Sequence, residues 1–288
     1  MRSTSETTAT LLLSGPDQRG IVAAVAEFVF RHGGNIVHAE QHTDDEQSIF
    51  FQRVEFALDG FDIDRVEIPT AVDELAASLD MQVQVRFSDE RPRVAMMVSR
   101  EPHCLYDLLA RWRSGELPAD VVGVVSNHPD HAVVAEHFGV PYHFLPVTPD
   151  TKADQERAAL DLFEAHGVDL VVLARYMQIL SALFIDRFPQ RIINIHHSFL
   201  PAFVGSRPYH QAHARGVKVI GVTAHYATEE LDQGPIIDQD VVRVSHRDTV
   251  RDLMHKGRDL EKAVLARAVL AHLEHRVLVY GGKTVVFS

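Results

Sequence analysis

The spacing of hydrophobic and polar positions changes near residue 90 and divides the chain into two parts. Strand-like alternation and helical spacing follow one another in the first part, as strand 8–15, helix 18–34, strands 35–44 and 48–58, helix 70–79 and strand 81–87. This βαββαβ order is typical of a ferredoxin-like unit. A polar, charged and proline-bearing stretch follows. We therefore predict one domain at residues 1–87 and a linker at 88–92.

Residues 93–288 show a different rhythm, in which short and wholly apolar strands alternate with helices. The predicted strands are 93–99, 120–126, 169–174 and 191–195, with helices near 104–113, 130–138, 152–166 and 181–187. Strands apolar on both faces indicate a parallel sheet covered by helices, that is, a doubly wound and mostly parallel α/β domain. Further strands near 218–226 and 235–243, a helix at 248–274 and a hairpin around Gly281-Gly282 complete it.

Composition narrows the classes of partner. The chain has 288 residues, 28 Lys and Arg against 40 Asp and Glu, and a net charge of −12. This acidic balance argues against a nucleic acid or an anionic membrane as the main partner. Cys104 is the only cysteine, which excludes an internal disulfide and fits a reducing compartment. No apolar stretch approaches the roughly 20 residues of a membrane helix, so we expect a cytoplasmic protein.

Polar residues stand at the end of one apolar strand, in the sequence RIINIHH (191–197). Residues two apart in a strand share a face, so Asn194 and His196 point the same way, and ligands of open parallel sheets bind at the carboxyl ends of strands. A purely structural role for the pair is an open alternative. Asp232, in the turn DQGP (232–235), is by itself an ordinary solvated turn residue. Acyl transfer, however, needs an oxyanion donor, a proton shuttle and a carboxylate, which Asn, His and Asp supply.

Other chemistries find less support in the residues. Four histidines, at 196, 197, 210 and 213, lie near one another in the sequence, but no H-E-x-x-H motif or cysteine pair accompanies them, so we expect no metal. No G-x-G-x-x-G follows the strand at 93–99, which argues against a dinucleotide. The segment GKT (282–284) lacks the upstream glycine and following helix of a phosphate loop.

Three longer segments carry a resemblance to a known family. NIHHSFLPAF (194–203), LARYMQILS (173–181) and HYATEELDQGPII (225–237) are similar to the folate-dependent formyltransferases, and within them to the deformylases of 10-formyltetrahydrofolate. SGPDQRGIV (14–22) and GGNIVHAEQH (33–42) resemble an ACT domain. The resemblance implies hydrolysis of 10-formyltetrahydrofolate to tetrahydrofolate and formate, which supplies formate and balances the one-carbon folate pool for purine synthesis. It implies no cofactor beyond the folate substrate.

The resemblance also assigns roles to individual residues. It implies that Asn194 polarises the formyl carbonyl, that His196 is the general acid and base, and that Asp232 is the carboxylate paired with it. His197 and His225 are expected either to support these three or to be structural. The residues implied to bind the folate are Met177, Gln178, Ile179, Leu180, Ala227, Thr228 and Leu231.

One departure from the related enzymes bears on the acceptor of the formyl group. Glycinamide ribonucleotide formyltransferases carry a glycine-rich phosphate loop after the first strand, whereas this chain has SREPHC (99–104) there. Without glycines the backbone cannot cradle a phosphate, which favours water as acceptor. Two alternatives stay open: a formyltransferase that uses an amine acceptor, and a non-catalytic sensor of an amino acid or folate.

The ACT-like part predicts regulation and assembly. ACT-like units pair across protomers and bind an amino acid near the first strand–helix loop, so the resemblance implies a homo-oligomer with glycine or methionine as effector. Asp17 and Gly20 in that loop, and Asn35 at the start of the next strand, are the candidate effector residues. A glycine lets a helix N-terminus approach a carboxylate closely. The alternative is that this part serves only dimerisation.

Overall fold

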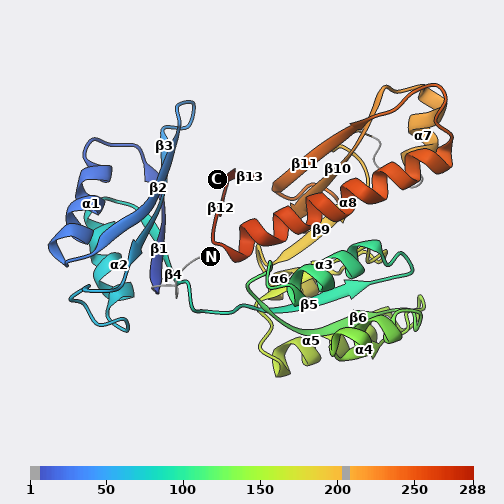
Figure 1. The fold of residues 1–288 in the computed structure, drawn as a ribbon, viewed down its shortest axis with the longest axis horizontal. Coiled ribbons are helices and arrows are strands. Elements are labelled where there is room, and N and C mark those ends of the chain that lie inside the picture. Colours follow the sequence, from blue (N-terminus) through green and yellow to red (C-terminus); the bar gives the residue numbers. More distant parts are fainter. Residues whose placement is uncertain (1–6, 203–207) are drawn as a thin grey trace. The chain divides into compact units, whose positions relative to one another are not determined.

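The computed structural model describes residues 7–202 and 208–288, which form two compact units (Figure 1). The first unit comprises the residues up to Arg91 together with His275–Tyr280 and Val285–Ser288, and the second comprises Pro92–Glu274 and Gly281–Thr284. The sequence-based division assigned all residues after 92 to the second domain. Most of the last fourteen residues pack instead with the first unit.

The first unit follows the predicted βαββαβ order. Its elements are β1 (Thr8–Pro16), α1 (Ile21–Arg31), β2 (Asn35–Asp44), β3 (Ile49–Ala57), α2 (Ile68–Ser78) and β4 (Gln82–Phe87). The four strands form an antiparallel sheet in the order β2-β3-β1-β4, as in a ferredoxin-like fold. Apolar side chains on one face of this sheet, among them Leu11 and Leu13, pack against both helices, which contribute Val25 from α1 and Val72 from α2. Alternation along β1 therefore buries every second residue under the helices.

The other face of this sheet is covered by the end of the chain. Strands β12 (Val277–Tyr280) and β13 (Lys283–Val286) form the predicted hairpin, and Gly281 and Gly282 have φ values of 50° and 79°. Such left-handed angles are those of a two-residue hairpin turn. Leu278 and Phe287 pack with Leu12 and Phe51 in a small apolar cluster. The C-terminal residues thus complete the core of the first unit.

The second unit is built on one seven-stranded sheet. Its elements are β5 (Arg93–Val98), α3 (His103–Arg113), β6 (Asp120–Ser126), α4 (Ala132–Phe138), β7 (Tyr142–Phe144), α5 (Lys152–Ala165), β8 (Leu170–Leu173), α6 (Ala182–Arg187), β9 (Ile192–His196), α7 (Pro208–Arg215), β10 (Val219–Tyr226), β11 (Ile236–Arg243) and α8 (Val250–Leu273). The strand order is β11-β10-β9-β8-β5-β6-β7. Strands β5 to β9 are parallel, and β10 and β11 extend the sheet antiparallel. The sequence pattern did not predict β7 or α7.

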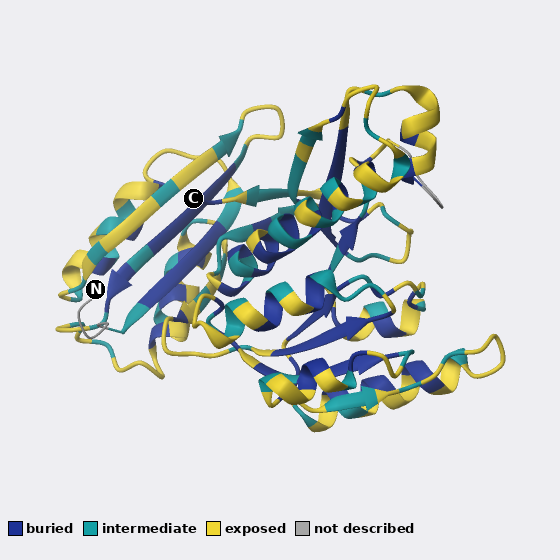
Figure 2. Cartoon of the chain, turned by 45° about the vertical axis from the view of Figure 1, so that its right-hand side comes forward, coloured by how far each residue is buried: buried dark blue, intermediate teal, exposed yellow. Residues whose placement is uncertain are grey.

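Helices cover both faces of this sheet, as a doubly wound fold requires. Helices α5 and α6 bury residues such as Phe163 and Phe184 against Met97 and Val171 on one face. Helix α8 packs along β9, β10 and β11 and contacts α3, as Figure 1 shows. Figure 2 shows the central strands dark blue and the solvent-facing sides of the helices yellow. Alternate residues of each parallel strand therefore enter two separate cores.

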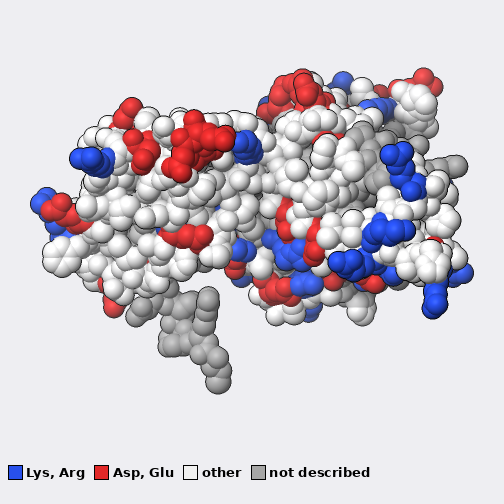
Figure 3. Space-filling model, turned by 90° about the horizontal axis from the view of Figure 1, so that it is seen from above, with Lys and Arg blue, Asp and Glu red and all other residues white. Residues whose placement is uncertain are grey.

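The surface agrees with the acidic composition. On the face shown in Figure 3, acidic and basic side chains gather in separate small groups rather than in one broad basic patch. No helix within residues 7–202 and 208–288 is long and apolar enough to cross a membrane.

Candidate active site

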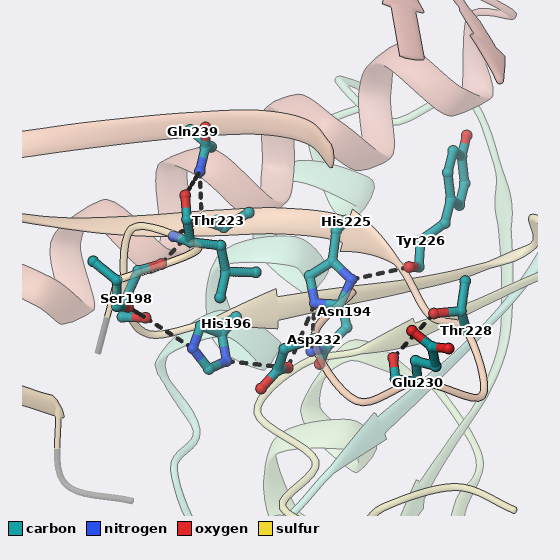
Figure 4. Close-up of polar contacts among 12 residues, drawn as sticks. Asn194, His196, Ser198, Thr223, His225, Tyr226, Thr228, Glu230, Asp232 and Gln239 are labelled. Carbon is teal, nitrogen blue, oxygen red and sulfur yellow. Dashed lines mark hydrogen bonds and ion pairs between the residues drawn. The ribbon is translucent and has the colours of Figure 1, made fainter. Parts of the chain in front are cut away.

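The antiparallel ladder between β9 and β10 brings the polar strand-end residues together (Figure 4). Asn194 pairs with His225, and His196 pairs with Thr223. Because residues two apart in a strand share a face, these four side chains lie on one face at the carboxyl end of β9. A register shift in the β10–β11 pairing falls at His225 and ends the regular ladder there.

Asp232 reaches the same place from the turn after β10. Its φ of 58° is left-handed, a conformation that Asp tolerates better than most residues. Gly234 lets the turn pass close to the backbone of Tyr226, because a Cβ at this position would lie 1.7 Å from the carbonyl oxygen of Tyr226. The amide of Tyr226 in turn donates to the carbonyl of Pro235 over 2.9 Å. The turn is therefore fastened to the end of β10, and its carboxylate faces β9.

The carboxylate of Asp232 contacts two imidazoles. Its Oδ1 lies 3.2 Å from Nδ1 of His196 and 3.7 Å from Nε2 of His225, and its side chain is 9% exposed. Burial alone would raise the pKa of Asp232, but hydrogen bonding to His196 outweighs burial and holds the pKa well below its usual range. Asp232 is therefore ionised throughout the neutral range.

His225 fixes the orientation of the Asn194 amide. Its Nδ1 lies 2.9 Å from the carbonyl oxygen of Tyr226, which can only accept, so Nδ1 carries the proton. In the neutral ring Nε2 is then an acceptor, and it receives the Nδ2–H of Asn194 over 3.2 Å. One amide hydrogen of Asn194 is used in this way, and the second is available to a ligand oxygen.

His196 is held from its other ring nitrogen as well. Its Nε2 lies 2.8 Å from Oγ of Ser198, whose hydroxyl donates to the carbonyl of Ala202 over 2.8 Å. The Thr223 hydroxyl donates to the Ser198 carbonyl over 3.0 Å and accepts from the Leu200 amide over 3.1 Å. Hydrogen bonds on both sides of the ring fix the position of His196, which is 4% exposed.

A cavity of about 310 Å³ opens beside these side chains, and it is large enough for part of a drug-sized ligand. Asn194, His196 and Asp232 all line it, as do His197 and His225. So do all of the residues predicted to bind the folate, namely Met177, Gln178, Ile179, Leu180, Ala227, Thr228 and Leu231. The sequence-predicted catalytic and folate residues therefore surround one cavity.

Buried polar contacts hold the segment of the cavity wall after β8. The amide of Met177 donates to Oγ of Ser99 over 3.0 Å. Glu156, 5% exposed on α5, accepts from the backbone amide of Ser181 over 3.1 Å and from its hydroxyl. Between these two points Met177 and Ile179 are 56% and 58% exposed. Exposed apolar side chains on a fastened loop offer a surface for a flat aromatic ligand.

A second buried polar cluster, which we name the Glu261 cluster, contains His103, Arg175, Tyr209 and Glu261. Glu261 is 1% exposed, and its Oε2 lies 2.7 Å from Nε2 of His103 and 3.3 Å from Nε of Arg175. Its Oε1 accepts from the Tyr209 hydroxyl over 2.8 Å. Burial opposes the charge, but the His103 hydrogen bond and the Arg175 charge lower the pKa of Glu261 below its usual value. Arg175 also lines the cavity and has a left-handed φ of 65°.

Among the described residues, one group of three potential metal ligands comes together, namely His103, Cys104 and Glu261, with ligand atoms within 4.8 Å of one another. The guanidinium of Arg175 lies on the same carboxylate and repels a cation. Burial, and next the charge of Glu261, raise the pKa of the Cys104 thiol well above its usual value. A thiol in that state is a poor metal ligand, so this group is better explained as an internal ion pair.

Sequence reasoning did not identify Arg175 or Glu261. The signal for Glu261 lies in α8, where Leu253, Gly257 and Val264 are buried at helical spacing and Glu261 falls on the same face. A carboxylate on an apolar stripe indicates a buried partner. Arg175 carries no comparable signal, because its left-handed backbone is visible only in the structure.

The three candidate effector residues lie apart within one chain. Asp17 and Gly20 follow the end of β1, and the Asp17 amide donates to the carbonyl of Ser48 over 2.9 Å. Asn35 pairs with Ala57, at the opposite end of the same sheet. The nine steps of β2 that separate these ends correspond to roughly 30 Å at about 3.4 Å per residue. A site that contains all three residues therefore needs more than one protomer.

Comparison with known proteins identifies both units. A family model described as formyl transferase matches residues 92–269, and one described as ACT domain matches residues 9–80. A formyltetrahydrofolate deformylase of Synechocystis sp. is 57% identical, over 98% of this chain and 99% of its own length. The predicted fold class, an ACT domain followed by a formyltransferase-like α/β domain, is confirmed.

Solved structures give the same assignment. The crystal structure of a formyltetrahydrofolate deformylase from Pseudomonas syringae has a TM-score of 0.97 and 47% identity, and the match covers 100% of this chain and 96% of that one. A glycinamide ribonucleotide transformylase from Symbiobacterium toebii has a TM-score of 0.65 and 33% identity, over 69% of this chain and 95% of that one. The chain therefore belongs to the formyltetrahydrofolate deformylase family.

Proposed function

We propose that this enzyme hydrolyses 10-formyltetrahydrofolate to tetrahydrofolate and formate, with Asn194, His196 and Asp232 as its catalytic residues. The free amide hydrogen of Asn194 donates to the formyl oxygen as negative charge develops on it. Water attacks the formyl carbon while the His196–Asp232 pair takes a proton from it. The pair then returns a proton to the leaving nitrogen, which leaves poorly as an anion. The products belong to one-carbon metabolism, where formate feeds purine synthesis.

The observation that carries this proposal is the convergence of the three side chains on one cavity, with Oδ1 of Asp232 3.2 Å from Nδ1 of His196. The predicted folate-binding residues line the same cavity. Exposed Met177, Ile179 and Leu231 offer apolar contact to the pterin, and polar groups lie deeper. The folate is the substrate, and we assign no further cofactor a role.

Water as the acceptor is favoured by how the neighbouring crevice is filled. Open α/β sheets bind ligands where the strand order reverses, which here is between β5 and β8. The Ser99 amide donates to the Arg175 carbonyl over 3.2 Å and bridges these strand ends. The segment after β5, SREPHC (99–104), contains no glycine. Its backbone therefore lacks the cradle that a phosphorylated amine would need, which favours water.

A formate-release assay tests the proposal. The purified enzyme should release formate from 10-formyltetrahydrofolate with no amine added, and should not formylate glycinamide ribonucleotide. Alanine at Asn194, His196 or Asp232 should each lower kcat by about 10²-fold or more while the protein stays folded. Near-normal turnover of His196→Ala, or formyl transfer faster than formate release, would count against it.

For the ACT domain we propose a regulatory role in a cytoplasmic homo-oligomer, with glycine or methionine as effector. Gly20 has a left-handed φ of 95° and is the N-cap of α1, and the space beside its Cα is open, which supports a carboxylate site at this end of the helix. Titration of each amino acid into the full-length enzyme, with formate release as readout, tests this. Coupling of about 1–3 kcal/mol would change substrate affinity roughly 5–150-fold. No response to either amino acid would leave only a role in assembly.

A further inference from the structure

His197 lies between the catalytic residues and the Glu261 cluster. It follows directly after β9 and lines the same cavity as Asn194, His196 and Asp232. Its ring centroid is 5.2 Å from that of His196 and 6.1 Å from that of Tyr209. The imidazole therefore stands in the wall of the cavity that the catalytic residues line, next to His196.

In the other two imidazoles of the cavity wall, both ring nitrogens have a protein partner. His196 uses its ring nitrogens on Asp232 and Ser198, and His225 uses its own on Tyr226 and Asn194. His197 makes no hydrogen bond to any side chain or backbone group in the part of the chain that the structure describes. A half-buried polar ring that has no hydrogen bond to any described residue keeps its hydrogen-bonding capacity for water or a ligand.

The surroundings keep His197 neutral. Burial lowers the pKa of His197 to about 4, and the charge of Arg175 adds to this effect. Glu261 acts in the opposite direction, but Arg175 and two hydrogen bonds already compensate its carboxylate. A neutral imidazole has one nitrogen that accepts a hydrogen bond, and here it stays neutral over the whole working range of pH.

We propose that His197 is a further catalytic residue, which accepts a hydrogen bond from the attacking water. This inference rests on the proposed hydrolysis. One hydrogen of the water faces the His196–Asp232 pair and the other faces His197, so that a lone pair points at the formyl carbon. The oxygen bonds to that carbon, the C–N bond breaks, and the proton taken by the pair ends on the leaving nitrogen. Formic acid then loses its remaining acidic proton to solvent.

The test compares substitutions that keep or remove the acceptor. His197→Phe keeps an aromatic ring but has no acceptor, and we expect its kcat to fall about 10-fold or more with KM within about threefold of wild type. His197→Asn offers a carbonyl oxygen and should recover part of the loss. His213→Phe, on the exposed side of α7, is the matched control and should behave as wild type.

Chemical rescue separates a catalytic role from a structural one. Imidazole added to His197→Ala should raise its kcat severalfold in a saturable manner, while the affinity for the product tetrahydrofolate stays unchanged. This variant also serves if His197→Phe does not fold. Wild-type kcat in His197→Phe, or loss of activity in all three variants without rescue, would overturn the proposal for His197. A wild-type enzyme that releases no formate would instead overturn the hydrolysis itself, and the role of His197 with it.

Discussion

Asp232 lies 3.2 Å from His196 but also only 3.7 Å from His225, so one carboxylate oxygen serves two imidazoles with different tasks. The first imidazole moves protons in the proposed reaction, and the second orients the amide of Asn194. Substitution of Asp232 should therefore affect the proton shuttle and the oxyanion donor together. The left-handed backbone of Asp232 makes this double contact possible from a turn rather than from a strand.

The ionisation of Asp232 should make stability depend on pH. Its folded pKa lies below the unfolded value of about 3.9. The ionised carboxylate therefore makes its full contribution to the free energy of unfolding above the unfolded pKa. This contribution is lost as the pH falls towards the folded pKa. We expect Asp232→Asn to lower the free energy of unfolding at pH 7 by about 1–3 kcal/mol, and the difference from wild type to shrink between about pH 4 and pH 2. Urea titrations at several pH values measure it.

The control for this experiment is Asp154→Asn, because Asp154 is 77% exposed on α5. It should change the free energy of unfolding by less than about 0.5 kcal/mol at any pH. If the deficit of Asp232→Asn stayed constant from pH 7 to pH 3, the carboxylate would not be held ionised by its contact with His196.

His225 should act through Asn194 rather than on the substrate. His225→Leu removes the acceptor at Nε2 and leaves the Asn194 amide free to rotate. We expect kcat to fall about 10–100-fold with little change in KM, since the lost hydrogen bond forms fully only to the developing oxyanion. His225→Gln places an amide oxygen near the same position and should retain more activity. A larger loss in His225→Gln than in His225→Leu would contradict this role.

Gly234 should be irreplaceable for a steric reason. An alanine Cβ would lie 1.7 Å from the Tyr226 carbonyl oxygen, so the turn that carries Asp232 would have to move. We expect Gly234→Ala to lose about 1–3 kcal/mol, or roughly 3–10 °C of thermal midpoint, and most of its activity. Gly123→Ala is the control, because its Cβ would find its nearest neighbour at 3.5 Å. Equal midpoints for the two variants would show that the turn has more room.

Local periodicity was sufficient to predict most of the elements, and the failures have physical reasons. Helix α7 has only three buried residues, Pro208, Tyr209 and Ala212, so its eight residues carry no clear apolar stripe. Strand β7 has three residues, which is too short for alternation to register. In the first unit, by contrast, β1, β3 and both helices bury apolar residues at regular spacing, and all of its elements were predicted in the correct order.

The residues of the candidate site also divide into those that the sequence could predict and those that it could not. Asn194 and His196 share a strand face, which the sequence spacing alone implies, and a turn signal marks Asp232. The partners of Glu261 come from α7, from α3 and from the segment after β8, at separations that no local pattern links. Tertiary packing alone brings a carboxylate and a guanidinium together in a core, so the Glu261 cluster could not be predicted.

The Glu261 cluster should be held together by charge compensation, and Glu261→Gln tests this. The substitution leaves the Arg175 guanidinium, which is 12% exposed, without its carboxylate. Removing one partner of a buried ion pair costs about 3–5 kcal/mol, because the remaining charge is uncompensated. For a chain of this size that corresponds to a fall of roughly 6–20 °C in thermal midpoint. Glu136→Gln, at an exposed position on α4, is the matched control and should change little.

A double substitution separates lost charge compensation from lost packing. Arg175→Met together with Glu261→Gln removes both charges. The double variant should therefore lose less free energy of unfolding than the sum of the losses in the two single variants, by about 1–3 kcal/mol. Formate release by each folded variant reports the effect of the substitution on the active-site cavity. Because Arg175 lines that cavity, we expect activity to fall in Arg175→Met even where the protein stays folded. Strict additivity of the two free-energy changes would mean that Arg175 and Glu261 act independently, and that their charges do not compensate each other.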